Sequence, residues 1–477
     1  MELDQELSTG LDHDALQRSA HDHLLLHFSR HGSYGPGGDE LLVLERGEGC
    51  HVWDTHGRRH VDGLSSLFCA QLGYSYGDEM AAVASAQLRR LPFNTNWASA
   101  HPAAIELAER LAALTPGDLD KVFFTSGGSE SVETAWKLVR QFHIANGQPE
   151  RTKAIARKNA YHGVTLGALS FTGVAWMKEP YGRPPVEVAT VSATNAFRAP
   201  DGDDEQAFCR RLLDEVERAI EAEGPETVAM IIAEPVQNAG GALTPPEGYW
   251  PGLREIADRH GILLVADEVI CGFGRIGDWF ASSRYGVVPD LMTTAKGITS
   301  AYAPMGAVFV SSRVAEPLYQ PKVPLNHGIT FGGHPLSAAI ALKNIEIFER
   351  DRVIENVREL EPYIGARLDE LRSLPIVGDV RGAGFFWAIE LVKDSDDTTF
   401  DAAEREDLVK TWFPRRLVEA GLIARADDRG DVVLCLSPPL VADRVVLDEI
   451  VDITADVLAD AAEHMGIAAA GARAGVA

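Results

Sequence analysis

The chain has 477 residues, and because single hydrophobic cores stop growing well below that length, two or three domains are expected. Its hydrophobic content of 45% and charged content of 24% are those of an ordinary globular protein. The formal net charge is −26, and a surface that acidic repels phosphate backbones and anionic lipid, so no nucleic acid or membrane partner is expected.

The five cysteines are scattered and show no Cys-x-x-Cys spacing, a usage typical of reduced thiols in a reducing compartment. The first residues are acidic and polar, without the basic and apolar regions of a signal peptide. No run approaches the roughly 20 apolar residues that span a bilayer. We therefore expect a cytoplasmic protein.

Residues 1–36 are predicted to form an N-terminal arm with one amphipathic stretch, His21 to His31. Within it His23, His27 and His31 recur every four residues and would share one helix face, a spacing that can bind metal. No acidic or cysteine partner stands nearby at ligand spacing, and packing of the arm on a subunit interface explains the histidines as well. No metal is expected.

From about residue 80 the chain alternates between predicted helices and strands, the pattern of a parallel sheet covered by helices. Strands are predicted at Val122 to Phe124, Val228 to Ala233, Ile262 to Ala266, Leu291 to Thr294 and Ala307 to Val310. Helices are predicted at Cys209 to Glu223, at Tyr249 to His260 with Gly261 closing it, and at Leu336 to Arg350. A C-terminal α+β region follows.

Three groups follow strands of this predicted sheet. Ser126, Asp267 and Lys296 each come just after a strand, and ligands bind at the carboxyl ends of parallel strands. An aldehyde cofactor needs an amine that holds it as a Schiff base, which a partly desolvated lysine supplies. A carboxylate can pair with its pyridinium nitrogen. A surface lysine and a helix-capping aspartate are the plainer alternatives.

The segment Ser126 to Glu130 reads Ser-Gly-Gly-Ser-Glu and opens a helix. Glycines let the backbone approach a phosphate, and the first N–H groups and the dipole of the helix attract an anion. A capped helix after a tight turn is the alternative; a nucleotide P-loop is excluded because no Gly-Lys-Ser/Thr follows. With Tyr161 as a stacking partner for an aromatic ring, these groups predict a pyridoxal 5'-phosphate site.

On these residues the chain resembles the class III pyridoxal-phosphate-dependent aminotransferases of fold type I, and among them the ω-transaminases, over roughly residues 35 to 465. The matching motifs are Phe123 to Glu130, Tyr161-His162-Gly163, Ala233 to Gln237, Asp267 to Arg275, Ala295-Lys296-Gly297 and Thr330 to Pro335.

The resemblance implies an α/β fold with a large domain built on a mostly parallel seven-stranded sheet covered by helices. A smaller α+β domain would come from both chain ends. The expected parts are the arm at 1–36, the N-terminal part of the small domain at 37–78, the large pyridoxal-phosphate-binding domain at 79–334 and the C-terminal small domain at 335–477.

The resemblance also implies roles. Lys296 would carry the Schiff base and move the proton, and Asp267 would pair with the ring nitrogen. Tyr161 and Val269 would sandwich the ring, and Glu234 would belong to the cofactor site.

The phosphate would be held by Gly127, Gly128 and Ser129, with Thr330 reaching it from the partner of a homodimer; pairing of dimers into tetramers is left open. The family usually has Asn-Ser-Gly-Ser where this chain has Ser126 to Ser129, so a hydroxyl is missing at Gly127.

For the substrate, Arg425 matches the arginine that binds carboxylates in this family. Relatives acting on ornithine or γ-aminobutyrate carry an acid that pairs with that arginine, where this chain has Ala239, and often a glutamine at Ile270. Phe68 matches an aromatic that lines the pocket, and Trp97 matches one more loosely.

We therefore predict an aminotransferase of the ω-transaminase type that moves an amino group from an amine or ω-amino acid to pyruvate or a similar keto acid by a ping-pong mechanism. An aminomutase or racemase of the same class is the alternative. A binding protein that kept the fold and lost the chemistry is a third reading, against which the intact Lys296 and Asp267 speak.

Overall fold

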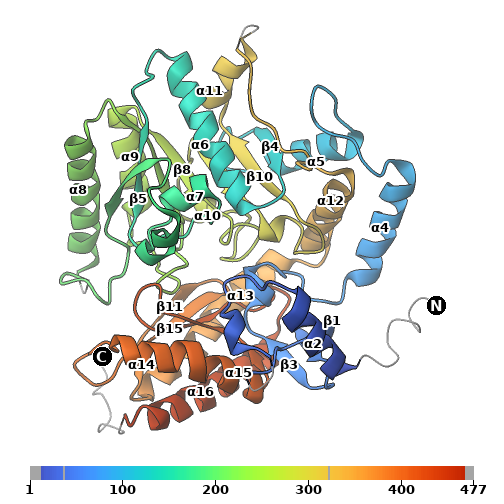
Figure 1. Cartoon of the computed structure of the whole chain (residues 1–477). Coiled ribbons are helices and arrows are strands. Elements are labelled where there is room, and N and C mark those ends of the chain that lie inside the picture. The colour runs from blue at the N-terminus through green and yellow to red at the C-terminus, as the bar shows by residue number, and fades with distance from the viewer. Residues whose placement is uncertain (1–11, 36–37, 203, 321–322, 468–477) are drawn as a thin grey trace.

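A computed structural model describes residues 12–35, 38–202, 204–320 and 323–467 (Figure 1). Its centre is a seven-stranded sheet with the strand order β4-β10-β9-β8-β7-β5-β6. β10 runs antiparallel to both of its neighbours and the other neighbouring strands are parallel, so the mostly parallel sheet is confirmed. The strands are β4 (Lys121–Thr125), β5 (Lys153–Arg157), β6 (Glu187–Val191), β7 (Val228–Ala233), β8 (Leu263–Asp267), β9 (Leu291–Thr294) and β10 (Gly306–Val310).

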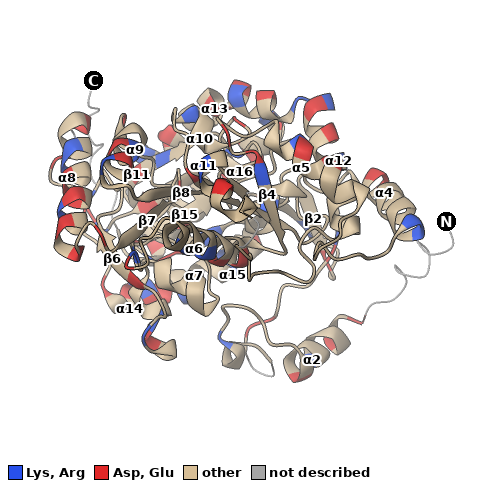
Figure 2. Ribbon diagram, turned by 90° about the horizontal axis from the view of Figure 1, so that it is seen from above, with Lys and Arg blue, Asp and Glu red and all other residues tan. Residues whose placement is uncertain are grey.

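The middle strands are buried because helices cover both faces of the sheet, and β7 is apolar throughout. All six residues of β7 are buried. Met230 and Ile232 pack into one apolar cluster and Ile231 into another, as the alternation of side chains along a strand requires. The covering helices include α6 (Gly128–Ala145), α8 (Glu205–Glu223) and α9 (Tyr249–His260). Charged residues gather on outer helices such as α8, whereas the central strands carry few (Figure 2).

The smaller part of the molecule holds two four-stranded sheets, ordered β1-β2-β3-β13 and β11-β12-β15-β14. β13 pairs with β3 in parallel, so residues from both chain ends share one sheet, and the blue and red segments lie together (Figure 1). The strands are β1 (Leu44–Glu48), β2 (His51–Asp54), β3 (Arg59–Asp62), β11 (Val377–Ala383), β12 (Phe386–Leu391), β13 (Leu422–Ile423), β14 (Arg425–Asp427) and β15 (Val433–Leu436). The helices are α13 (Val353–Asp369), α14 (Ala402–Asp407), α15 (Phe413–Ala420) and α16 (Arg444–His464).

The three predicted helices are confirmed, with small differences at their ends. α9 has the predicted bounds, and Gly261 closes it with the left-handed backbone that favours glycine (φ +65°). α8 begins earlier than predicted because the Asp204 side chain caps it by accepting the Ala207 N–H. The remaining helices are α2 (His13–His23), α3 (Ser65–Phe68), α4 (Gly77–Arg90), α5 (Pro102–Ala112), α7 (Leu166–Phe171), α10 (Ala281–Arg284), α11 (Ser312–Ala315) and α12 (Pro335–Arg350). None of the helices in the described ranges is long and apolar enough to cross a membrane.

The prediction that three histidines of the arm share a helix face is wrong. These are His23, His27 and His31. α2 already ends at the first of them and buries no residue, and a helix without a buried face gains little from extension. The arm instead brings His13 against Glu40 and His56, with 2.7 Å between the His56 Nε2 and a Glu40 oxygen and 3.9 Å between the two imidazole rings.

Candidate active site

A cavity of about 490 Å³ lies at the carboxyl ends of the central strands. Its volume is within the range of small-molecule sites. Eight of the predicted site residues line it: Gly127, Gly128, Ser129, Tyr161, Glu234, Asp267, Val269 and Lys296. The order of the strands therefore brings together residues that are up to 169 positions apart in the chain.

Lys296 stands two residues after the end of β9 and begins a short 3-10 turn that extends to Ile298. Its backbone has a φ of +47°, a left-handed conformation that is strained for any residue with a side chain. Burial lowers the pKa of the amine from its ordinary value, while Cys69 and Asp267 act in the opposite direction. A lysine with a lowered pKa offers the neutral amine that both covalent attachment and proton removal require.

Asp267 ends β8 and is buried, and three donors fix its carboxylate. One oxygen accepts the Val269 N–H at 3.2 Å and the Thr293 hydroxyl at 3.0 Å, and the other lies 2.7 Å from the His162 Nδ1. The sequence reasoning missed His162 and Thr293 as partners of this carboxylate. For His162 a signal existed, since it adjoins Tyr161 in a motif already noted, but nothing in the sequence indicates which residue it faces.

The first turn of α6 forms the cradle that the sequence predicts for a phosphate. Gly127 precedes the helix in extended backbone (φ −179°), and no side chain caps it. A Cβ built on Gly128 would meet the Val269 side chain at 3.0 Å, whereas a Cβ on Gly127 would enter open space. The Ser129 hydroxyl accepts the Val164 N–H at 3.1 Å and keeps its own hydrogen for another acceptor. The start of α6 has no side-chain cap and has open space beside Gly127, so it suits an anion.

Glu234 acts on this cavity through Tyr161. One of its buried oxygens accepts the Tyr161 N–H at 3.0 Å, and the other accepts the Asn238 N–H at 2.9 Å. The Tyr161 ring lies under the guanidinium of Arg429, 5.2 Å from ring centre to Cζ. Burial raises the pKa of Tyr161, and the positive charges of Arg429 and Arg425 oppose the rise. Glu234 thus sets where the ring of Tyr161 lies.

Arg425 and Phe68 lie beside the cavity and are not among the residues that line it. Arg425 is on β14, and its charge helps to lower the pKa of Lys296. Phe68 is buried, meets Phe386 edge-on at 5.6 Å between ring centres, and belongs to the apolar cluster that contains Ile270. It supports the wall that Ile270 presents to the cavity.

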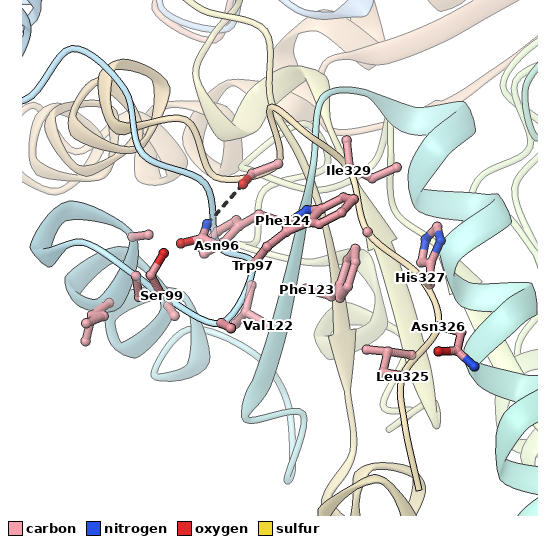
Figure 3. Close-up of a pocket in the computed structure, with 17 residues that line it drawn as sticks. Asn96, Trp97, Ser99, Val122, Phe123, Phe124, Leu325, Asn326, His327 and Ile329 are labelled. Carbon is pink, nitrogen blue, oxygen red and sulfur yellow. Dashed lines mark hydrogen bonds between the residues drawn. The ribbon is translucent and has the colours of Figure 1, made fainter.

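Trp97 and Thr330 lie elsewhere in the chain's structure. Trp97 lines a second, larger groove of about 880 Å³ together with Phe123, Phe124 and Ile329 (Figure 3). Its indole is 59% exposed, and Thr330, which follows Ile329, is exposed too. Within one subunit neither residue joins Lys296.

Comparison with known proteins agrees with this geometry. The family described as "Aminotransferase class-III" matches residues 34–458. "Probable aminotransferase Rv3329" from Mycobacterium tuberculosis is 47% identical over 94% of this chain and 95% of its own length. "Putrescine--pyruvate aminotransferase" from Pseudomonas aeruginosa is 39% identical over 91% of this chain and 94% of its own.

Solved structures are similar as well. An (S)-enantioselective ω-transaminase from Thermomicrobium roseum is 39% identical with a TM-score of 0.90, covering 95% of this chain and 99% of that one. The ω-transaminase from Pseudomonas jessenii, solved in complex with PMP, is 34% identical with a TM-score of 0.88, covering 94% and 99%. The chain therefore belongs to the class III aminotransferases. It is an enzyme that transfers amino groups, and its family depends on pyridoxal phosphate.

Proposed function

We propose that the enzyme moves an amino group from an amine that need not carry a carboxylate to pyruvate or a similar keto acid. The observation that carries this proposal is the meeting of Lys296, Asp267 and the uncapped start of α6 in one cavity. Ala239 and Ile270 support it, because the acid and glutamine of relatives acting on ornithine or γ-aminobutyrate are absent. The name of the putrescine–pyruvate relative points to substrates of the same kind.

Pyridoxal phosphate, when bound, supplies an aldehyde that accepts the amino group and a ring that withdraws electrons from the substrate carbon. Lys296 would hold the aldehyde covalently and, once the incoming substrate amine has displaced it, would move the proton at the substrate carbon, for which its lowered pKa suits it. The Asp267 carboxylate would pair with the ring nitrogen and keep it protonated, and His162 and Thr293 hold that carboxylate in place.

The remaining cavity residues hold the cofactor without taking part in proton transfer. Tyr161 and Val269 would contact the two faces of its ring. Gly127, Gly128 and Ser129 receive the phosphate at the start of α6 through N–H groups and the Ser129 hydroxyl. Arg425 binds the carboxylate of the keto acid.

The deciding experiment is a panel of donors with pyruvate as acceptor. With a suitable amine or diamine that lacks a carboxylate, alanine should form, and the donor alone should release one equivalent of its carbonyl product. An aminomutase or racemase would release none. Lys296→Ala should abolish both reactions, whereas Lys158→Ala, which changes an exposed lysine, should keep them. Turnover by the Lys296→Ala enzyme would refute the assignment.

We also propose a homodimer that buries the larger groove. Large apolar side chains gather around that groove: Phe93, Trp97, Ile105, Leu325 and Phe331 are all exposed in the single chain. Contiguous apolar surface of this kind is typical of a subunit interface. In the dimer, Thr330 would reach the phosphate of the partner's cofactor.

A further inference from the structure

Three charged residues at alternate positions on and just after the edge strand β14 lie beside the cavity: Arg425, Asp427 and Arg429. Arg425 and Asp427 are two positions apart on β14 and therefore point to the same side of the strand. Asp427 accepts the backbone N–H of Arg429 at 2.9 Å and the Arg429 Nε–H at 2.8 to 2.9 Å, and the Arg429 Nη2 also donates to it. The Arg429 and Asp427 side chains are only 5% and 2% exposed.

Arg425 is held far more loosely. Its Nη2 lies 3.4 Å from an oxygen of the same Asp427 carboxylate, longer than the usual 2.7–2.9 Å of a charged hydrogen bond. In the part of the chain that the structure describes, this is the one ion pair of its guanidinium, and the side chain is 31% exposed. Asp427 thus gives most of its bonding to Arg429 and keeps a weak contact with Arg425.

The charge of the group is fixed. Burial acts to raise the pKa of Asp427, but the charge and hydrogen bonds of Arg429, with a contribution from Arg425, lower it to about 2. Two guanidinium groups and one carboxylate therefore leave a net charge of +1 next to Tyr161, which lines the cavity. Asp267 and Glu234 also act on Tyr161, so the group offers a substrate carboxylate a specific partner, Arg425, rather than an uncompensated charge.

We propose that Asp427 and Arg429 are positioning residues that set how readily Arg425 leaves its place for the cavity, an inference that rests on the proposed function of Arg425. Arg425 pairs with Asp427 while an amine without a carboxylate is bound. Arg429 occupies Asp427 so fully that Arg425 can leave without exposing an unpaired buried carboxylate. This carboxylate, two residues along the same strand, would serve where relatives use the acid that Ala239 replaces.

Two substitutions should shift substrate binding in opposite directions. Asp427→Asn removes the charge that pairs with Arg425, so Arg425 should lie in the cavity more often. The KM for pyruvate should then fall and the KM for an amine without a carboxylate should rise, each about three- to tenfold. Arg429→Met leaves Arg425 as the main partner of Asp427, so the KM for pyruvate should rise by a similar factor. Asp428→Asn, which changes the neighbouring carboxylate that pairs with Lys410, should alter neither KM.

Since either single change leaves a buried charge less well paired, the double variant Asp427→Asn with Arg429→Gln provides a neutral pair. The double variant should resemble Asp427→Asn in both KM values. In these two variants propionate, competing with the amine, should inhibit more strongly than in the unaltered enzyme. Equal losses of kcat with unchanged KM values, or KM values that move in one direction in all variants, would overturn the proposal.

Failure of the proposed function would look different. If the unaltered enzyme forms no alanine from any amine and pyruvate, the assignment of the reaction fails. If it does form alanine but Arg425→Ala leaves the KM for pyruvate unchanged, the carboxylate site is elsewhere and the positioning role falls with it.

Discussion

Lys296 combines two features that an ordinary lysine avoids. Its backbone is left-handed, at a cost of about 1–2 kcal/mol for a residue with a side chain, and its amine is buried. Ser300 and Ala301, a few residues on, also have positive φ values, and Ala301 lines the same cavity. Strain of this kind persists where the surroundings enforce it, and here it directs an amine of lowered pKa at the cavity.

The buried amine predicts a dependence of stability on pH in the cofactor-free enzyme. The pKa of Lys296 in the folded chain lies below the ordinary 10.5, so between these two pKa values the unfolded chain binds more protons than the folded chain. The loss of folding stability is therefore fully present below the lowered pKa and vanishes above 10.5. Lys296→Met should raise the Tm at pH 7 by on the order of 2 °C. The gain should shrink as the pH approaches 10.

Thermal unfolding across that pH range measures the effect. Lys158→Met, at an exposed position, is the matched control and should show no such trend. A gain for Lys296→Met that stays constant with pH would mean that packing, and not the proton, causes it.

Gly127 predicts a gain in cofactor affinity. Its extended backbone suits any residue and a Cβ there meets no atom within 4 Å, so Gly127→Ser adds a hydroxyl without strain. One further hydrogen bond to the phosphate is equivalent to about 1 kcal/mol, or roughly a fivefold lower Kd for pyridoxal phosphate.

Equilibrium dialysis of the cofactor with the apo enzyme tests this gain. Gly128→Ala, whose methyl group would meet Val269 at 3.0 Å, should raise the Kd instead. If the serine variant binds the cofactor no better, the phosphate does not lie against Gly127.

At the scale of elements, the register between neighbouring strands builds the site. Asp267 at the end of β8 stands opposite Thr293 on β9, and the threonine hydroxyl donates to the carboxylate. Thr294, the next residue, points to the other face of the sheet and donates to the Ala307 carbonyl at 3.2 Å. Two adjacent threonines of one strand thus have separate tasks.

This arrangement predicts different results for one substitution at two neighbouring positions. Thr293→Val removes a donor from the Asp267 carboxylate and should lower kcat/KM roughly three- to tenfold, the equivalent of about 1 kcal/mol. Thr294→Val should lower stability by a similar amount and leave kcat/KM near that of the unaltered enzyme. Steady-state kinetics and thermal unfolding of both variants decide, and equal kinetic losses would contradict the separation of roles.

The sequence predicts this level of structure well where local signals suffice. The predicted bounds of β7 and β9 are confirmed to the residue, and the end of β9 correctly indicates where Lys296 lies. What it does not predict depends on contacts between distant residues. The end of α2, the pairing of His162 with Asp267 and the grip of Arg429 on Asp427 follow from what packs nearby, and no periodic pattern records that.

The whole molecule pairs an early and a late segment of the chain in its smaller part and has an apolar groove on its large part. β3 and β13, separated by most of the chain, pair in one sheet of the smaller part. The groove lies across the large part, where Trp97 packs so close to the backbone of Gly328 that a Cβ there would meet its indole at 2.8 Å. This contact fixes the position of the Trp97 indole although the side chain is exposed. A fixed, exposed aromatic side chain is typical of a residue that contributes strongly to a protein interface.

A charge placed at that position should separate the proposed dimer. Trp97→Asp puts a carboxylate into an apolar contact, where leaving it unpaired costs several kcal/mol, so the sedimentation coefficient should fall to that of a single chain. Because Thr330 of the partner would then be lost from the phosphate, the Kd for pyridoxal phosphate should rise as well. Val445→Asp, which places the same charge on an exposed apolar residue of α16, should change neither. A dimer that survives Trp97→Asp with its cofactor affinity intact would show that the subunits meet through a different surface.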